Sequence, residues 1–142
     1  MKVTVRLFER LEGNASGGRD AVDPLDGVLA VEELPHQRMI IAGVVITDPS
    51  AELIGRPVEF WGRCVPAGRA DGPAGRSAEM AAEAAAESPA FTRLVDINEA
   101  AGRHTFVIPV RIDVSDFGDY EVVISNPFAE VGRAPLEVTL DL

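Results

Sequence analysis

The sequence has little of what disulfide-stabilised, secreted or membrane-spanning proteins depend on. Cys64 is the only cysteine, so an intrachain disulfide is impossible. No apolar run approaches the roughly 20 residues that a membrane-spanning helix needs. The N-terminus, MKVTVRLFERLEG, lacks the apolar core of a signal peptide because charges return from Arg6 onward. These absences predict a cytoplasmic protein.

Positive charge is also scarce. Lys2 is the only lysine, and 13 basic residues face 23 acidic ones, which gives a formal net charge of −10 and a pI of about 4.6. An acidic surface repels phosphate backbones and anionic headgroups. We therefore expect neither nucleic acid nor a membrane surface as a partner. The length of 142 residues fits one domain, over 1–142, that can bury a sizeable core.

Most of what is present alternates with a period of two, as half-buried strands do. In KVTVRLF, Val3, Val5 and Leu7 fall on one face, with Thr4 and Arg6 opposite. The pattern predicts eight strands, over 2–8, 27–34, 38–47, 57–65, 91–97, 104–114, 119–125 and 135–142. Nine apolar or aromatic residues are the expected core: Ile40, Val44, Phe60, Phe106, Ile108, Tyr120, Val122, Leu136 and Val138.

Three segments refine this pattern. RMIIAGVVIT, residues 38–47, is apolar nearly throughout, which predicts a central strand that is buried on both faces. Pro109 interrupts an alternating strand and favours an edge strand or a bulge. GNASGGRD, residues 13–20, is rich in glycine and small polar residues and predicts a loop.

One segment indicates a helix. RSAEMAAEAAAES, residues 76–88, is rich in alanine, and Pro89 prevents its continuation. Short strands separated by turn signals, with a single helix, are typical of an all-β protein. We therefore expect an antiparallel two-sheet sandwich with one short helix inserted at about 76–88.

The stretch DVSDFGDYEVVIS, residues 113–125, contains the D-F-G triplet of protein kinases. The kinase set also needs a glycine-rich loop, a strand lysine and an H-R-D loop, none of which occurs here. Asp116, Gly118 and Tyr120 instead form D-x-G-x-Y before an alternating strand. Gly118 suits a tight turn. The stretch therefore predicts a structural corner.

This D-x-G-x-Y pattern resembles the tyrosine corner of immunoglobulin-like sandwiches, in which a tyrosine at the start of a late strand bonds to nearby backbone. The layout is also similar to small bacterial β-sandwich domains of uncharacterised function, through LPHQRMIIAGVVI, the G-x-Y strand and GRAPLEV. Val122 stands where immunoglobulin domains carry their second cysteine. The resemblance implies an immunoglobulin-like sandwich without a disulfide, and it implies no catalytic residues.

Candidate binding residues lie in two places. Glu79, Glu83 and Glu87 form an acidic stripe on the expected helix, beside a small-residue face that includes Met80. This face either caps the open side of the sandwich or docks a basic partner. Trp61 points to the face opposite Phe60, so it belongs to a second layer, lies under the helix or serves an interface.

The sequence predicts no catalytic residue, no cofactor and no metal. His36 and His104 lie in separate segments at strand ends, and zinc needs three or four ligands. Asp116, Asp119 and Glu121 crowd the corner, but acidic turns are common without a cation. Cys64 is expected to be a small buried hydrophobe and not a nucleophile.

Three hypotheses of function follow. The first is a non-catalytic protein–protein interaction module in a bacterial cytoplasm that acts through loops, the helix or an edge strand. The second is a small-ligand or carbohydrate-binding sandwich that uses Trp61 as a stacking platform. The third, an enzyme that uses loop carboxylates, has no motif to support it. Sandwiches host many unrelated functions, so the fold alone does not choose among them.

Overall fold

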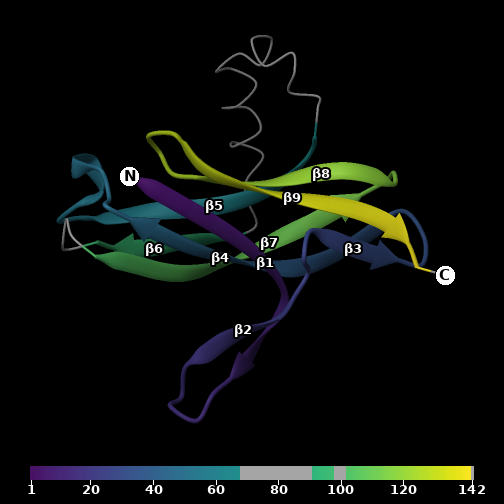
Figure 1. Cartoon of the computed structure of the whole chain (residues 1–142), viewed down its shortest axis with the longest axis horizontal. Coiled ribbons are helices and arrows are strands. Elements are labelled where there is room, and N and C mark those ends of the chain that lie inside the picture. Colours follow the sequence, from purple (N-terminus) through teal and green to yellow (C-terminus); the bar gives the residue numbers. More distant parts are fainter. Residues whose placement is uncertain (68–90, 98–101, 142) are drawn as a thin grey trace.

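The computed structural model describes residues 1–67, 91–97 and 102–141 and consists of two β-sheets packed face to face (Figure 1). Within these residues the single helical element is a 3-10 turn at Ala51–Leu53, and no helix is long and apolar enough to cross a membrane. The helix expected at 76–88, with Met80, Glu79, Glu83 and Glu87, lies outside the described residues. The prediction of an all-β, two-sheet sandwich is confirmed.

Nine strands form the two sheets. The four-stranded sheet, here called sheet A, has the order β2 (Arg19–Pro24), β1 (Lys2–Gly13), β4 (His36–Thr47) and β7 (Arg103–Val114). The five-stranded sheet, sheet B, has the order β3 (Val28–Val31), β9 (Glu130–Leu140), β8 (Gly118–Ser125), β5 (Pro57–Pro66) and β6 (Thr92–Asp96). Neighbouring strands are antiparallel except β3 and β9, which are parallel.

The core forms between the inner faces of the two sheets. Successive residues of a strand point to opposite faces, so every second side chain of a strand enters this space, and most of these side chains are apolar. Phe60 on β5 and Phe106 on β7 join the sheets, with ring centroids 4.9 Å apart. All nine expected core residues belong to this core; Tyr120 is half-buried against it and the other eight are buried.

Two glycines allow the sheets to approach each other closely. A Cβ added to Gly62 on β5 would lie 2.7 Å from Val110 Cγ2 of β7. A Cβ added to Gly132 on β9 would lie 2.9 Å from Val5 Cγ2 of β1. Both distances are shorter than van der Waals contact, so a side chain at either position would push the sheets apart.

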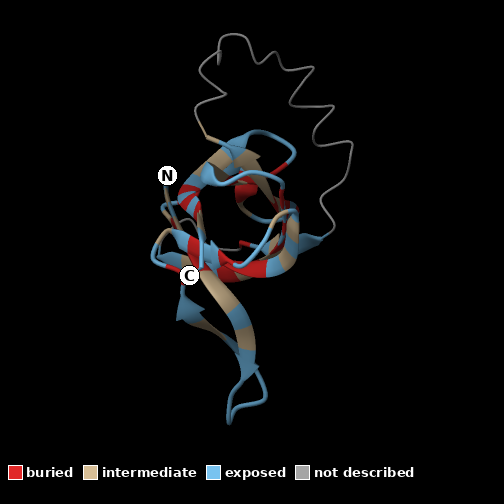
Figure 2. Cartoon of the chain, turned by 90° about the vertical axis from the view of Figure 1, so that its right-hand side faces the viewer, coloured by how far each residue is buried: buried red, intermediate tan, exposed pale blue. Residues whose placement is uncertain are grey.

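The β1–β2 hairpin departs from expectation. β1 continues to Gly13, past the predicted end at residue 8, and β2 was not predicted at all. Asn14 stabilises the turn between them, because its Oδ1 accepts hydrogen bonds from the backbone N–H groups of Ser16 and Gly18, each at 3.0 Å. The end of the hairpin projects from the sandwich (Figure 2), and residues 8–24 are exposed or half-buried. RDAVDP is too polar to indicate a strand by itself, so pairing with β1 supplies its structure.

The corner before β8 has the local geometry that the sequence indicates. Gly118 has a φ of 134°, which favours glycine over residues with a side chain. The Tyr120 hydroxyl donates a hydrogen bond to the backbone carbonyl oxygen of Asp116 at 2.8 Å. Asp116, Gly118 and Tyr120 therefore act in a structural turn between β7 and β8.

Pro109 lies where its chemistry requires. β7 is an edge strand of sheet A, with β4 as its hydrogen-bonded neighbour. Proline lacks a backbone N–H and is tolerated on such edges, where it blocks the addition of a further strand. The prediction of an edge strand at Pro109 is confirmed.

Candidate functional site

The described residues form a shallow groove on the outer face of sheet A, with a volume of about 610 Å³. β1, β4 and β7 form its floor. Arg19 and Ala21 of β2 and Arg93 of β6 add to its rim. A volume of this size is in the range of ligand sites. The groove is therefore the candidate functional site.

Strand register determines how its floor is built. Thr4, Val45 and Thr105 lie opposite one another across β1, β4 and β7. The next row along the same face has Arg6, Gly43 and Val107. A third row has Phe8, Ile41 and Pro109 and closes this end with apolar side chains. The floor is therefore apolar with two hydroxyl groups, those of Thr4 and Thr105.

Gly43 leaves the centre of this floor without a side chain. A Cβ at this position would lie 3.0 Å from Phe8 Cε2 and 3.7 Å from the Arg6 carbonyl oxygen. Glycine inside a strand often marks a place where a ligand or another backbone approaches closely. Here it exposes the backbone of β4 and the edge of the Phe8 ring to whatever occupies the groove.

The rim of the groove is cationic. Arg6, Arg19, Arg93 and Arg103 line it, and no aspartate or glutamate is among its described lining residues. All four arginines are exposed, and no ion pair joins any of them to a carboxylate in the described part of the chain. The guanidinium carbon of Arg6 lies 5.5 Å from the centre of the Phe8 ring, a cation–π contact that holds this side chain over the floor.

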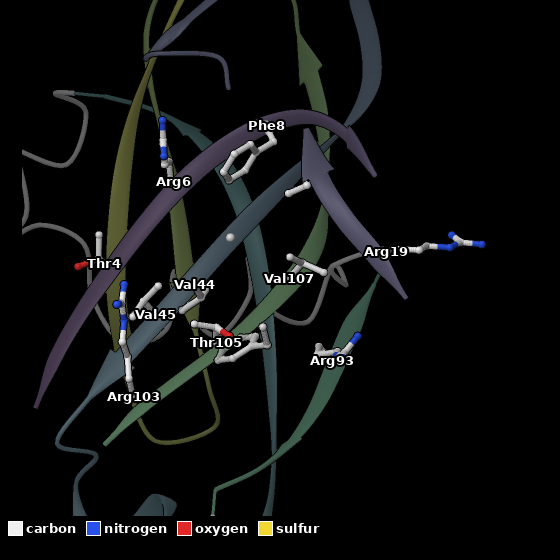
Figure 3. Close-up of a pocket in the computed structure, with 13 residues that line it drawn as sticks. Thr4, Arg6, Phe8, Arg19, Val44, Val45, Arg93, Arg103, Thr105 and Val107 are labelled. Carbon is white, nitrogen blue, oxygen red and sulfur yellow. The ribbon is translucent and has the colours of Figure 1, made fainter. Parts of the chain in front are cut away.

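Figure 3 shows how these side chains are distributed. Arg6 and Arg103 lie on one side of the view, and Arg19 and Arg93 lie on the other. Thr105 and Val107 lie between the two sides, and Val45 lies beside Arg103. Arg93 reaches this surface because it opposes the inward-facing Phe60 on sheet B and β6 contacts the edge of sheet A beside β7. An inward charge on an edge strand also discourages sheet-to-sheet association, so Arg93 serves that purpose as well.

The groove corrects one expectation from the sequence. Residues 38–47 were expected to be buried on both faces, but only the inner face of β4 is covered by the core. On the outer face Met39 is exposed, Ile41 is buried, and Gly43 and Val45 are half-buried beneath the groove. The signal that was missed is an apolar strand whose outer face is only partly covered, with a glycine at its centre.

Trp61 is not among the groove-lining residues. It lies half-buried on the outer face of sheet B, where it opposes Thr92 of β6 and Ser125 of β8. It therefore faces away from the core, as expected, but it is on the sheet opposite the groove. Carbohydrate binding at Trp61 stays a prediction.

The other residues considered for chemistry do not come together. His36 opposes Val114 and His104 opposes Ile46, so the histidines lie at opposite ends of the β4–β7 ladder. Both are half-buried, and His36 Nε2 has no hydrogen-bond partner among the described residues. Among the residues described, no group of three or more histidine, cysteine, aspartate or glutamate side chains could hold a metal ion.

Cys64 packs against the core on the inner side of sheet B, opposite Val122. Burial raises the pKa of its thiol to about 12 from an ordinary value of 9.0. A thiol that keeps its proton is a poor nucleophile. This agrees with its interpretation as a small hydrophobe.

Comparison of the chain with models of known protein families gave no match, and comparison with curated proteins gave no similar sequence.

Proposed function

We propose that this protein is a non-catalytic, immunoglobulin-like binding module that receives a protein partner at the arginine-rimmed groove of sheet A. The observation that carries the proposal is the gathering of four arginines, with no described carboxylate among them, around an apolar floor. Arginine and aromatic side chains are enriched at protein interfaces.

Strand order supports the immunoglobulin-like part of the proposal. In immunoglobulin domains one sheet contains strands in the order A-B-E and the other in the order C-F-G. β1, β4 and β7 have the first order, and β5, β8 and β9 have the second. β6 lies beside β5, where variable-type domains add a strand. The Tyr120–Asp116 hydrogen bond lies at the β7–β8 turn, which corresponds to the position of the tyrosine corner.

The openness of the groove supports a protein partner over a small molecule. Small-molecule sites enclose most of the surface of their ligand. The groove is the outer face of a sheet, and its walls are exposed arginine side chains instead of core elements. A polypeptide can lie across such a face and bury the apolar floor, whereas a small molecule would keep much of its surface in water.

The test is capture of partners from a native lysate by the tagged protein and by two charge-matched variants. The groove variant carries Arg6→Gln and Arg103→Gln, and the control carries Arg56→Gln and Arg133→Gln, which lie outside the groove. Each variant loses two positive charges. We expect a partner that the wild type and the control retain and that the groove variant loses. Equal capture by all three proteins would contradict the proposal.

A further inference from the structure

The charge of the groove differs from that of the protein around it. The chain has a net charge of −10, yet four of its 13 basic residues line this one surface without a described carboxylate beside them. Asp113 lies on the same face at the far end of β7, where Gln37 Nε2 donates a hydrogen bond to it at 3.2 Å. An anionic partner is therefore repelled by most of the molecule and attracted to the groove, which directs it to one place.

The residues of the floor indicate which arrangement of charged and apolar groups in the partner would fit the groove. Between Arg6 and Arg103 the face presents Gly43, Val45 and Thr105. The row of Arg6 and the row of Arg103 are four residues apart along the strands, roughly 13 Å, and β1 and β7 are two strands apart, roughly 10 Å, so the diagonal between the two positions is roughly 16 Å. In an extended segment, residues i, i+2 and i+4 point to one side and span roughly 13 Å, and the long arginine side chains can cover the remaining few ångströms. Carboxylates at both ends and an apolar side chain between them would therefore match the groove.

From these features, and resting on the function proposed above, we infer that the partner presents an extended acidic segment with the pattern acidic-x-apolar-x-acidic. Its two carboxylates pair with the guanidinium groups of Arg6 and Arg103, a geometry that arginine favours through two parallel hydrogen bonds. Its apolar side chain lies on the floor over Gly43 and Val45. Nucleic acid fits less well, because the acidic surface outside the groove would face its remaining phosphates.

Peptide titrations followed by 1H–15N NMR test this inference. The probe is the capped nine-residue peptide G-S-D-S-L-S-E-S-G, and the matched control is G-S-N-S-L-S-Q-S-G, which differs only in charge. We expect saturable shifts at the amides of Gly43, Val45 and Val107 with the acidic peptide. Affinity for the control should be at least ten-fold lower. Raising NaCl from 50 to 500 mM should weaken the acidic peptide at least ten-fold, because salt screens exposed ion pairs.

Protein variants separate the contributions of charge and shape. Arg6→Gln with Arg103→Gln should weaken the acidic peptide at least ten-fold, and Arg56→Gln with Arg133→Gln should leave it within two-fold of the wild type. Gly43→Val fills the floor without changing charge and should also weaken binding at least ten-fold. Retention of the wild-type strand spectrum by circular dichroism excludes unfolding as the cause.

Several outcomes would overturn the inference and leave the proposed function standing. The first is equal binding of the neutral and the acidic peptide. The second is the absence of peptide binding together with groove-dependent capture from lysate. The third is displacement of the peptide by 10 mM inorganic phosphate, which would assign the groove to a small anion. A dimer by light scattering that the groove variant abolishes would make the occupant a second copy of the chain. Peptide shifts confined to Trp61 and its neighbours, without groove-dependent capture, would overturn both proposals.

Discussion

Arg133, on the outer face of sheet B, differs in its pairing from the arginines of the groove on sheet A. On sheet B, Arg133 donates through Nε and Nη2 to both carboxylate oxygens of Glu130, at 2.6 and 2.7 Å, and through Nη1 to Glu121 at 3.2 Å. The hydrogen bonds to Glu130, with those to Glu121, raise the pKa of Arg133. On sheet A, Arg6 and Arg103 have no such carboxylate among the described residues. Arg133 is therefore satisfied within the molecule, whereas Arg6 and Arg103 are exposed and form no ion pair with a described carboxylate.

This difference shows why a count of arginines says little about binding. Arg133 on β9 opposes Val123 on β8, and Glu121 lies two residues along β8 on the same outer face. Its ion pairs therefore form within sheet B as it folds. On sheet A the residues opposite Arg6 and Arg103 are Gly43 and Thr47, which offer no charge. Cross-strand neighbours decide whether an exposed cation is structural or available.

The largest expected effect concerns the Cys64 thiol, which lies on the inner side of sheet B. Its reactivity tests whether this side is closed to solvent, in contrast to the open groove on sheet A. At pH 8 a thiol with a pKa of about 12 has roughly 1,000-fold less thiolate than one with the ordinary value of 9.0. A thiolate of higher pKa is also more nucleophilic, which offsets part of this difference, so Ellman's reagent should react with Cys64 of the folded protein at least ten-fold more slowly than with the urea-unfolded chain. Equal rates would show that sheet B opens readily, and the contrast between the two faces would fail.

The raised pKa of Cys64 also predicts how the free energy of unfolding changes with pH. Because the folded protein keeps the Cys64 proton up to about pH 12 while the unfolded chain loses it near 9.0, the folded state binds more protons between these values. The free energy of unfolding should therefore fall as pH rises through this window. In Cys64→Ala that part of the fall should be absent, as measured by urea unfolding at pH 8, 9 and 10.

A second prediction compares a glycine between the sheets with the glycine in the groove. A Cβ in Gly62→Ala would meet Val110 Cγ2 at 2.7 Å and Ile124 Cδ1 at 3.0 Å inside the core, so we expect a loss of about 1–3 kcal/mol in the free energy of unfolding. In Gly43→Ala the nearest atom is Phe8 Cε2, on a half-buried ring that can turn outward. We expect a change within about 0.5 kcal/mol.

Urea unfolding at constant pH measures both variants. A loss in Gly43→Ala as large as that in Gly62→Ala would mean that the Phe8 ring is fixed by packing. The groove floor would then be part of the stability of sheet A and not a surface left open for a partner.

The inward-facing core residues could be predicted from the sequence, and the groove on the outer face of sheet A could not. Alternation places Val3, Val5 and Leu7 on one face because side chains in a strand have a period of two. It does not say which distant strands become neighbours. The arginines of the groove come from β1, β2, β6 and β7, and only the pairing of those strands brings them to one surface. A run such as RMIIAGVVIT also reads as buried on both sides whether or not anything covers it.

The smallest expected effect compares the paired Arg133 of sheet B with Arg6 of the groove, each replaced by glutamine. Arg133→Gln removes the pairs with Glu130 and Glu121, so the free energy of unfolding should fall by about 0.5–1 kcal/mol in 50 mM NaCl and by less in 500 mM NaCl. Arg6→Gln removes a cation without a described carboxylate partner and should show no loss that salt abolishes. A salt-sensitive loss in Arg6→Gln as large as that in Arg133→Gln would mean that Arg6 is already satisfied within the molecule, and the groove would lose one of the two cations that its acidic partner requires.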